Sequence, residues 1–249
     1  MKALRAMTWV ELKLFVREPL TVMFVLVLPL VVLYVLNGVF GSQPDPTVWQ
    51  GLSPIDFYTS AYVALVAATA GVLSLPVHLA GYREQGVLRR FRASAVRPTA
   101  LVGAHMAVTV AIATAGAVLL TILSVVAYDA ALPEDWVGVV AAFLLTAVSF
   151  AGLGALLGFL LPTARAAQGL GVLLFFVFMM LGGAGPPKEV LPPALSRIAD
   201  GIPVTHAGDL VRGPWMGEGW DGQALLFILA MLAVSLGLTA WRLRREAEG

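Results

Sequence analysis

The chain has 249 residues, of which 59% are hydrophobic and only 12% are charged, and its mean hydropathy is +0.87. Soluble domains carry about a quarter charged residues, so this composition excludes a soluble globular protein and indicates an all-α membrane protein with several helical spans. The chain has no cysteine, which excludes disulfides and thiolate chemistry. The formal net charge of +1 says little, because the charges are segregated along the chain.

The N-terminal segment 2–18 is predicted to be an amphipathic helix lying in the membrane interface. Trp9, Leu12 and Val16 share one stripe of this helix, and its basic residues lie elsewhere. The segment is too polar for the start of a signal peptide, and the apolar run that follows is long enough to span a membrane. We therefore expect an interfacial helix followed by a first span at about 20–40.

Five further apolar segments are predicted to cross the membrane as helices, for which a full crossing takes about 20 residues. They are separated by segments rich in Gly, Pro, Ser and Asp, which favour turns. The whole chain, 1–249, is therefore predicted to be one transmembrane domain. Its six spans are expected at about 20–40, 57–80, 99–127, 136–160, 167–181 and 223–241.

The segment 182–221, between the fifth and sixth spans, is unusually rich in Gly and Pro. It also contains two apolar, helix-like pieces at 191–198 and 204–211, which are too short to span. Such pieces can dip into a membrane as re-entrant helices if they are buried against protein. We expect this segment to form an outer structure over the spans.

The distribution of Lys and Arg predicts the orientation of the chain. With six spans and the N-terminus inside, only three of the 16 basic residues lie outside, namely Lys188, Arg197 and Arg212. Basic residues concentrate in cytoplasmic loops, so both termini are predicted to be cytoplasmic and segment 182–221 to lie outside.

The most basic stretch is Tyr82–Pro98, between the second and third spans, with five arginines and one acid, Glu84. It is predicted to contain a short helix over 82–93, with Val87, Leu88 and Phe91 on one face. Glu84 falls within that apolar face, where a carboxylate needs a partner. One interpretation is a topology signal that touches lipid head groups. The other is a docking helix for a cytoplasmic protein.

Small and polar residues inside the spans have two interpretations each. Gly154 and Gly158 form a GxxxG pattern, which favours close contact between helices within the subunit, with a subunit interface as the alternative. His105 is an ionisable residue inside a span, where function is the default hypothesis. Its position only about two turns from the cytoplasmic end favours a structural role.

The fifth span carries a run of aromatic and methionine residues, including Phe175, Phe176 and Met179. Such side chains usually face lipid or the protein core, but they would also suit a varied apolar cargo if this span lined a pathway. Tyr62, in the second span, is the further candidate for that pathway.

Motifs of membrane enzymes and of nucleotide binding are missing from the sequence. There is no H-E-x-x-H, no G-x-S-x-G and no phosphate-binding G-x-x-x-x-G-K-[ST]. The three histidines lie apart in sequence without a second ligand at metal spacing. We therefore expect no catalytic residue, no metal site and no cofactor bound by this chain itself.

The order of these features resembles the membrane subunit of a type-2 ATP-binding cassette exporter, of the bacterial drug and antibiotic efflux branch. The resemblance covers essentially the whole chain. It rests on an elbow helix that ends in R-E-P (Arg17, Glu18, Pro19), on six spans, and on the Gly/Pro-rich segment after the fifth span. The loop after the second span matches R-E-x-G-x-L-x-R at Arg83, Glu84, Gly86, Leu88 and Arg90.

The resemblance implies a transport role. Two copies of this subunit, or one copy and a homologue, would pair in the plasma membrane of a bacterium, and separate nucleotide-binding subunits would hold ATP and Mg below them. The coupling helix 82–93 would dock on those subunits through Arg83, Glu84, Gly86, Val87, Leu88, Arg90 and Phe91. A hydrophobic or amphipathic cargo would pass between the permeases along Tyr62, Phe175, Phe176 and Met179, beneath a gate formed by 182–221.

A non-transport membrane protein remains the alternative, either a scaffold or a lipid-modifying enzyme with an unrecognised site. The two hypotheses differ in their partner, because only a permease requires a nucleotide-binding subunit.

Overall fold

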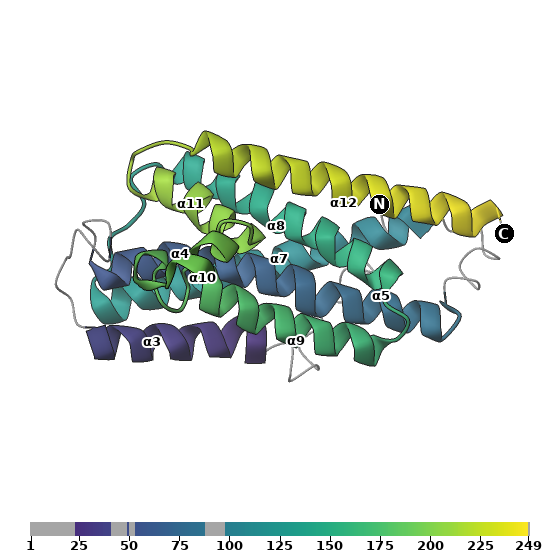
Figure 1. Ribbon diagram of the computed structural model, residues 1–249, viewed down its shortest axis with the longest axis horizontal. Helices are drawn as coiled ribbons and strands as arrows, with labels where there is room; N and C mark the ends of the chain where they lie inside the picture. The colour runs from purple at the N-terminus through teal and green to yellow at the C-terminus, as the bar shows by residue number, and fades with distance from the viewer. Residues whose placement is uncertain (1–22, 41–48, 50–52, 88–97, 249) are drawn as a thin grey trace.

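The computed structural model describes residues 23–40, 49, 53–87 and 98–248, and every regular element in these ranges is helical (Figure 1). The interfacial helix expected at 2–18 lies outside the described residues. The elements are η1 (Met23–Val27, a π-helix), α3 (Leu28–Phe40), α4 (Pro54–Thr69), η2 (Ala70–Ser74, a π-helix), α5 (Leu75–Glu84), α7 (Pro98–Tyr128), α8 (Trp136–Leu160), α9 (Ala164–Leu181), η3 (Lys188–Val190, a 3-10 helix), α10 (Pro193–Ala199), α11 (Pro203–Trp215) and α12 (Gly222–Glu248).

Within the described residues, five helices are long and apolar enough to cross a membrane, and they coincide with five of the six predicted spans. They are Pro54–Glu84, Thr99–Tyr128, Trp136–Leu160, Ala164–Leu181 and Gly222–Arg245. Over the first span, the described residues form η1 and α3, a shorter apolar helix. The membrane crossing expected at about 20–40 therefore stays a prediction.

The helix Pro54–Glu84, built from α4, η2 and α5, is the centre of the fold. Ser53 caps its start, with its hydroxyl oxygen accepting from the Asp56 N–H at 3.3 Å, and Pro54 occupies the first turn, where a missing N–H is harmless. The wide turn of η2 precedes Pro76, whose ring and missing N–H disturb the preceding helical turn. Nearly all of α4 and η2 is buried by the surrounding helices.

Small residues bring α8 directly against this central helix. A Cβ added to Gly154 would lie 2.0 Å from the Gly71 carbonyl oxygen, and one added to Gly158 would lie 2.7 Å from Leu79 Cβ. A Cβ on Gly71 would in turn lie 2.5 Å from the Phe150 backbone. The GxxxG pattern thus serves contact between helices inside the chain, which confirms the favoured interpretation.

Two short helices occupy the segment between α9 and α12, where the apolar pieces at 191–198 and 204–211 were expected. α10 contacts the end of α9, and α11 packs among α4, α8 and α12. The apolar face of α11, including Val204, Leu210 and Val211, is buried there. How deeply these helices enter a membrane stays a prediction.

The helices alternate in direction along one axis. In Figure 1 the end of α5, the turn between α8 and α9, and the C-terminal end of α12 lie towards the right, whereas α10 and α11 lie in the left half. The connections after α5 and α8 therefore share one end of the bundle with the end of α12. That this end faces the cytoplasm stays a prediction from the arginines.

Candidate functional site

The candidate site lies at the end of α5, where the predicted coupling helix starts. α5 continues to Glu84, and Gln85 and Gly86 then form a turn in which Gly86 has φ +69°. This left-handed conformation favours glycine and commonly ends helices. Within the predicted helix 82–93, the structure thus places Tyr82–Glu84 in the last turn of the span and a turn at Gln85 and Gly86. Residues 88–93 lie outside the described residues, so the rest of this helix stays a prediction.

The remaining residues of the predicted docking set fall beyond this turn. Val87 is half-buried, whereas Leu88, Arg90 and Phe91 lie outside the described residues. The structure therefore places Arg83, Glu84, Gly86 and Val87, and docking by the whole set stays a prediction.

Arg83 binds the C-terminal end of α8. Its Nη1 donates to the carbonyl oxygens of Gly158, Phe159 and Leu161, at 3.2, 2.7 and 3.2 Å. The guanidinium carbon lies 5.8 Å from the centre of the Phe159 ring. These carbonyls lie at the end of a helix, where they have no intrahelical partner and carry partial negative charge, so a cation is stabilising there.

Glu84 binds the start of the next helix. Its Oε2 accepts from the backbone N–H of Ala164, the first residue of α9, at 3.1 Å. A carboxylate is favourable at a helix N-terminus, where N–H groups lack partners. The Glu84 side chain is otherwise exposed. The turn at Gly86 lies between Glu84 and Val87, and the other residues of the expected apolar face, Leu88 and Phe91, lie outside the described residues.

Together, Arg83 and Glu84 hold both sides of the turn that joins α8 to α9. Two adjacent side chains of opposite charge thus complement the two helix ends of opposite polarity. The arrangement couples α5 to the ends of α8 and α9, so it can transmit a movement from one of these helices to the others. Sequence analysis found both residues but missed their partners, since helix ends 75 to 80 positions away have no local signal.

His105 is buried near the same end of the bundle. Its ring centre lies 5.9 Å from that of His78 and 5.3 Å from that of Tyr82. From α7, it thus packs against His78 and Tyr82 of α5 in an aromatic cluster. No group of three His, Asp or Glu side chains in the described parts of the chain could hold a metal ion.

The four residues expected to contact cargo do not share one surface. Tyr62 and Phe175 are fully buried and Met179 is nearly so, whereas the Phe176 side chain is 46% exposed. The Phe175 ring packs edge-on against Phe24 at 5.1 Å. Adjacent positions on a helix point in different directions, so only Phe176 can meet a cargo without rearrangement of the helices.

Tyr62 is unusual among these core residues. Its hydroxyl is buried and has no hydrogen-bond partner within the part of the chain that the structure describes. A buried polar group of this kind is costly, and it usually binds water or another polar group. Tyr62 therefore remains a candidate for the pathway, but only in a conformation that opens α4.

The outer segment forms a polar cup at the opposite end of the bundle. A cavity of about 470 Å³ is lined by residues of α4, η3, α10 and α11 and by the two glycines that follow α9. It includes Arg212 and Asp209, which form an ion pair at 3.4 Å. The Arg212 guanidinium also lies 4.1 Å from the centre of the Phe57 ring. Partial burial raises the pKa of Asp209 above its usual value, and Arg212 acts in the opposite direction.

Two further contacts connect this cup to the rest of the chain. The Tyr58 hydroxyl, on α4, donates to the Gly185 carbonyl oxygen at 2.9 Å. Lys188 forms an ion pair with Asp200, which precedes α11. The segment between α9 and α10 is thus attached both to the central helix, through Tyr58, and to the residues between α10 and α11, through Lys188.

A comparison with protein families adds the identity of the fold. The family model of the ABC-2 type transporter matches residues 2–216. No curated protein matches the chain. Permeases of this family are membrane subunits that work with ATP-binding subunits and are not themselves catalytic, which favours transport over the alternative of a scaffold or lipid-modifying enzyme. Because the match extends over most of the chain and includes four of its five candidate spans, the chain belongs to the ABC-2 type transporter family.

Proposed function

We propose that the chain is the permease of an ATP-driven exporter in the plasma membrane of a bacterium. Its cargo is a hydrophobic or amphipathic molecule, such as a drug, an antibiotic or a lipid-like compound. Two permease subunits form the pathway, and ATP and Mg bind to separate nucleotide-binding subunits that dock at the end of α5 and on the residues after it.

The contacts of Arg83 and Glu84 carry this proposal. The segment that would dock follows directly from these residues, and both hold the turn between α8 and α9. A displacement of the docking segment on ATP binding would therefore move the inner ends of α5, α8 and α9 together. ATP needs only to favour one of two packed arrangements for this displacement to open or close the pathway.

The character of the spans supports an apolar cargo. Every Asp and Glu among the described residues lies in a loop, at a helix end or in the outer segment, so the described spans offer no buried acid for proton or sodium coupling. α9 exposes Leu173, Phe176 and Met180, which are soft apolar side chains able to adapt to different molecules.

The test is co-purification of the nucleotide-binding subunit with Glu84→Ala and Glu84→Gln, together with cargo-stimulated ATP hydrolysis. Loss of the Glu84 carboxylate is expected to weaken docking or coupling by at least about tenfold, equivalent to about 1.4 kcal/mol. Glutamine retains a carbonyl that can accept from the Ala164 N–H but has no negative charge. A loss of docking in Glu84→Gln would therefore indicate an ion pair with the partner, whereas retained docking would indicate the contact within the chain.

Arg92→Ala is the control: helical periodicity predicts Arg92 outside the apolar face of Val87, Leu88 and Phe91, so it should matter less. If Glu84→Ala keeps full docking and full stimulation, the segment is only a topology signal and the proposal loses the contact on which it rests.

A further inference from the structure

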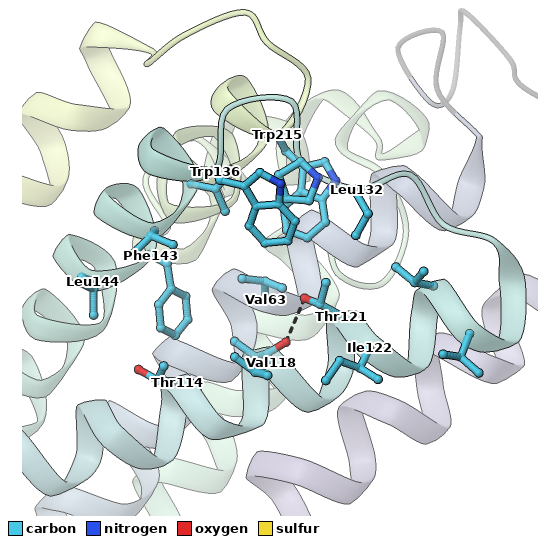
Figure 2. Close-up of a pocket in the computed structure, with 16 residues that line it drawn as sticks. Val63, Thr114, Val118, Thr121, Ile122, Leu132, Trp136, Phe143, Leu144 and Trp215 are labelled. Carbon is cyan, nitrogen blue, oxygen red and sulfur yellow. Dashed lines mark hydrogen bonds between the residues drawn. The ribbon is translucent and has the colours of Figure 1, made fainter.

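A second cavity lies far from the candidate site, between α7 and α8. It has a volume of about 400 Å³ and is lined mainly by Val, Ile, Leu, Phe and Trp side chains of these two helices, with Val63 and Trp215 contributing from α4 and α11. Figure 2 shows Leu132, Trp136 and Trp215 gathered at one end of it. We refer to this cavity as the α7–α8 groove.

Three of the few polar side chains in the wall of the groove, those of Thr114, Thr121 and Trp215, bind backbone carbonyls of the protein itself. Thr114 donates to the Val110 carbonyl at 2.7 Å, and Thr121 donates to the Ala117 carbonyl at 2.9 Å. The Trp215 indole N–H donates to the Ala131 carbonyl at 3.1 Å. The groove therefore offers apolar surface without orienting polar groups, which suits a hydrocarbon chain and not a polar solute.

The groove opens outward, to the side of the bundle. Val118 and Ile122 on α7 and Val140 on α8 are each about half exposed. Both helices are long and apolar enough to cross a membrane. Its opening thus faces the hydrocarbon layer, and an occupant would enter from lipid and not from water.

The length of the groove corresponds to one leaflet of a bilayer. On α7 it extends from Thr114 to Val126, which is roughly 18 Å at 1.5 Å per residue. Half of the hydrocarbon core is about 15 Å thick. Trp136 and Trp215 lie at the end next to the α7–α8 connection, and tryptophan is enriched where hydrocarbon meets the head groups.

The charges of the α7–α8 connection, which lies at that end, are all negative. From Thr99 to Ala164 the sequence contains no Lys or Arg, and its only acids are Asp129, Glu134 and Asp135 in the connection. All three are exposed. A head group with a positively charged amine is attracted to this rim, and a purely anionic head group is repelled.

We propose that the α7–α8 groove binds one acyl chain of a phospholipid whose head group carries an amine, from the leaflet next to the α7–α8 connection. This lipid site is independent of the proposed transport pathway. A second copy of the chain fits less well, because a two-fold interface would set one concave groove against another and leave the space unfilled.

The test is lipid binding to the purified, delipidated permease, followed by native mass spectrometry. Phosphatidylethanolamine and phosphatidylglycerol with identical acyl chains are compared. Wild type is expected to bind one phosphatidylethanolamine per chain at least about tenfold more tightly than phosphatidylglycerol.

Two variants fill the groove from opposite walls, Ile122→Trp on α7 and Val140→Trp on α8, and each should lose this binding by at least about tenfold. Leu226→Trp is the matched control, since Leu226 is 70% exposed on α12, away from the groove. Asp129→Asn combined with Glu134→Gln should retain binding but remove the preference for the amine. Asp135 is left intact, because its carboxylate accepts from the Gly138 N–H and caps α8.

A photoactivatable phosphatidylethanolamine tests the site in the wild-type protein, which covers the case in which the groove variants do not fold. It should label peptides of α7 and α8 that include Val118 or Val140. Equal affinity for the two lipids, equal losses in the groove and control variants, or labelling elsewhere would each overturn the proposal. A groove variant that changes the oligomeric mass and not the lipid count would identify the groove as a subunit interface instead.

Discussion

Arg83 and Glu84 show how the same two residues acquire different partners once the chain is folded. Their charges predicted a contact with another protein, but both side chains also stabilise helix ends within the chain. A single nitrogen of Arg83, Nη1, reaches three carbonyl oxygens at the end of α8.

Replacing Arg83 tests this contact directly. Arg83→Ala is expected to destabilise the purified protein by about 1.5–3 kcal/mol, because it leaves the carbonyls at the end of α8 without their charged donor. Arg83→Lys should recover part of the loss. Thermal unfolding in detergent measures both. Arg165→Ala, an exposed arginine at the start of α9, serves as the control and should be close to neutral.

The adjacent phenylalanines of α9 are expected to separate stability from cargo. Phe175 is fully buried, so Phe175→Ala should cost about 3–5 kcal/mol of stability. Phe176 is half exposed, so Phe176→Ala should leave folding nearly unchanged and alter which molecules stimulate ATP hydrolysis. Unchanged stimulation of Phe176→Ala across a broad panel of hydrophobic drugs and lipids would remove this residue from the pathway.

At the level of elements, the central helix and α8 form the rigid part of the bundle. Gly71, Gly154 and Gly158 allow the two backbones to touch, and the bulky side chains around them fill the remaining space. The peripheral helices α9 and α12 bury much less of their surface. A conformational change is therefore more easily accommodated by movement of the peripheral helices than by separation of α8 from the central helix.

Adding a methyl group at this contact should be costly. Gly154→Ala is expected to destabilise the protein by about 1–3 kcal/mol, because the new Cβ would meet the Gly71 carbonyl oxygen and the backbone would have to move. Gly103→Ala is the matched control, since Gly103 lies in a helix with nothing within 4 Å of an added Cβ. That control should be neutral or slightly stabilising, owing to the higher helix propensity of alanine. Equal unfolding temperatures for the two variants would contradict the close contact.

At the level of the whole molecule, the bundle has two chemically different ends. One carries the α8–α9 turn and the exposed arginines of α12, and the other carries the polar cup formed by α10 and α11. This polarity matches the distribution of basic residues along the sequence, from which the membrane orientation was predicted.

The absence of native cysteine allows this orientation to be measured by labelling. A cysteine at Ala194, which is exposed on α10, should react with an impermeant maleimide in intact cells. One at Gln85, exposed after α5, should react only after the membrane is permeabilised. The reverse pattern would invert the predicted topology.

The sequence by itself determined the class of the fold, most of the spans and the position of the basic segment. These follow from hydrophobicity over about 20 residues, from Gly and Pro, and from charge, all of which act locally along the chain. The GxxxG pattern was also recognisable, because the size of a side chain alone decides whether two helices can touch.

Only the tertiary structure decided which residues meet. α5 ends at a turn that contains Gly86, and the Glu84 carboxylate binds the start of α9. Likewise, the burial of Tyr62 and Phe175 and the groove between α7 and α8 depend on how distant helices pack. Such contacts join residues far apart in sequence, so hydrophobic periodicity can indicate that a face is apolar but not whether protein or lipid covers it.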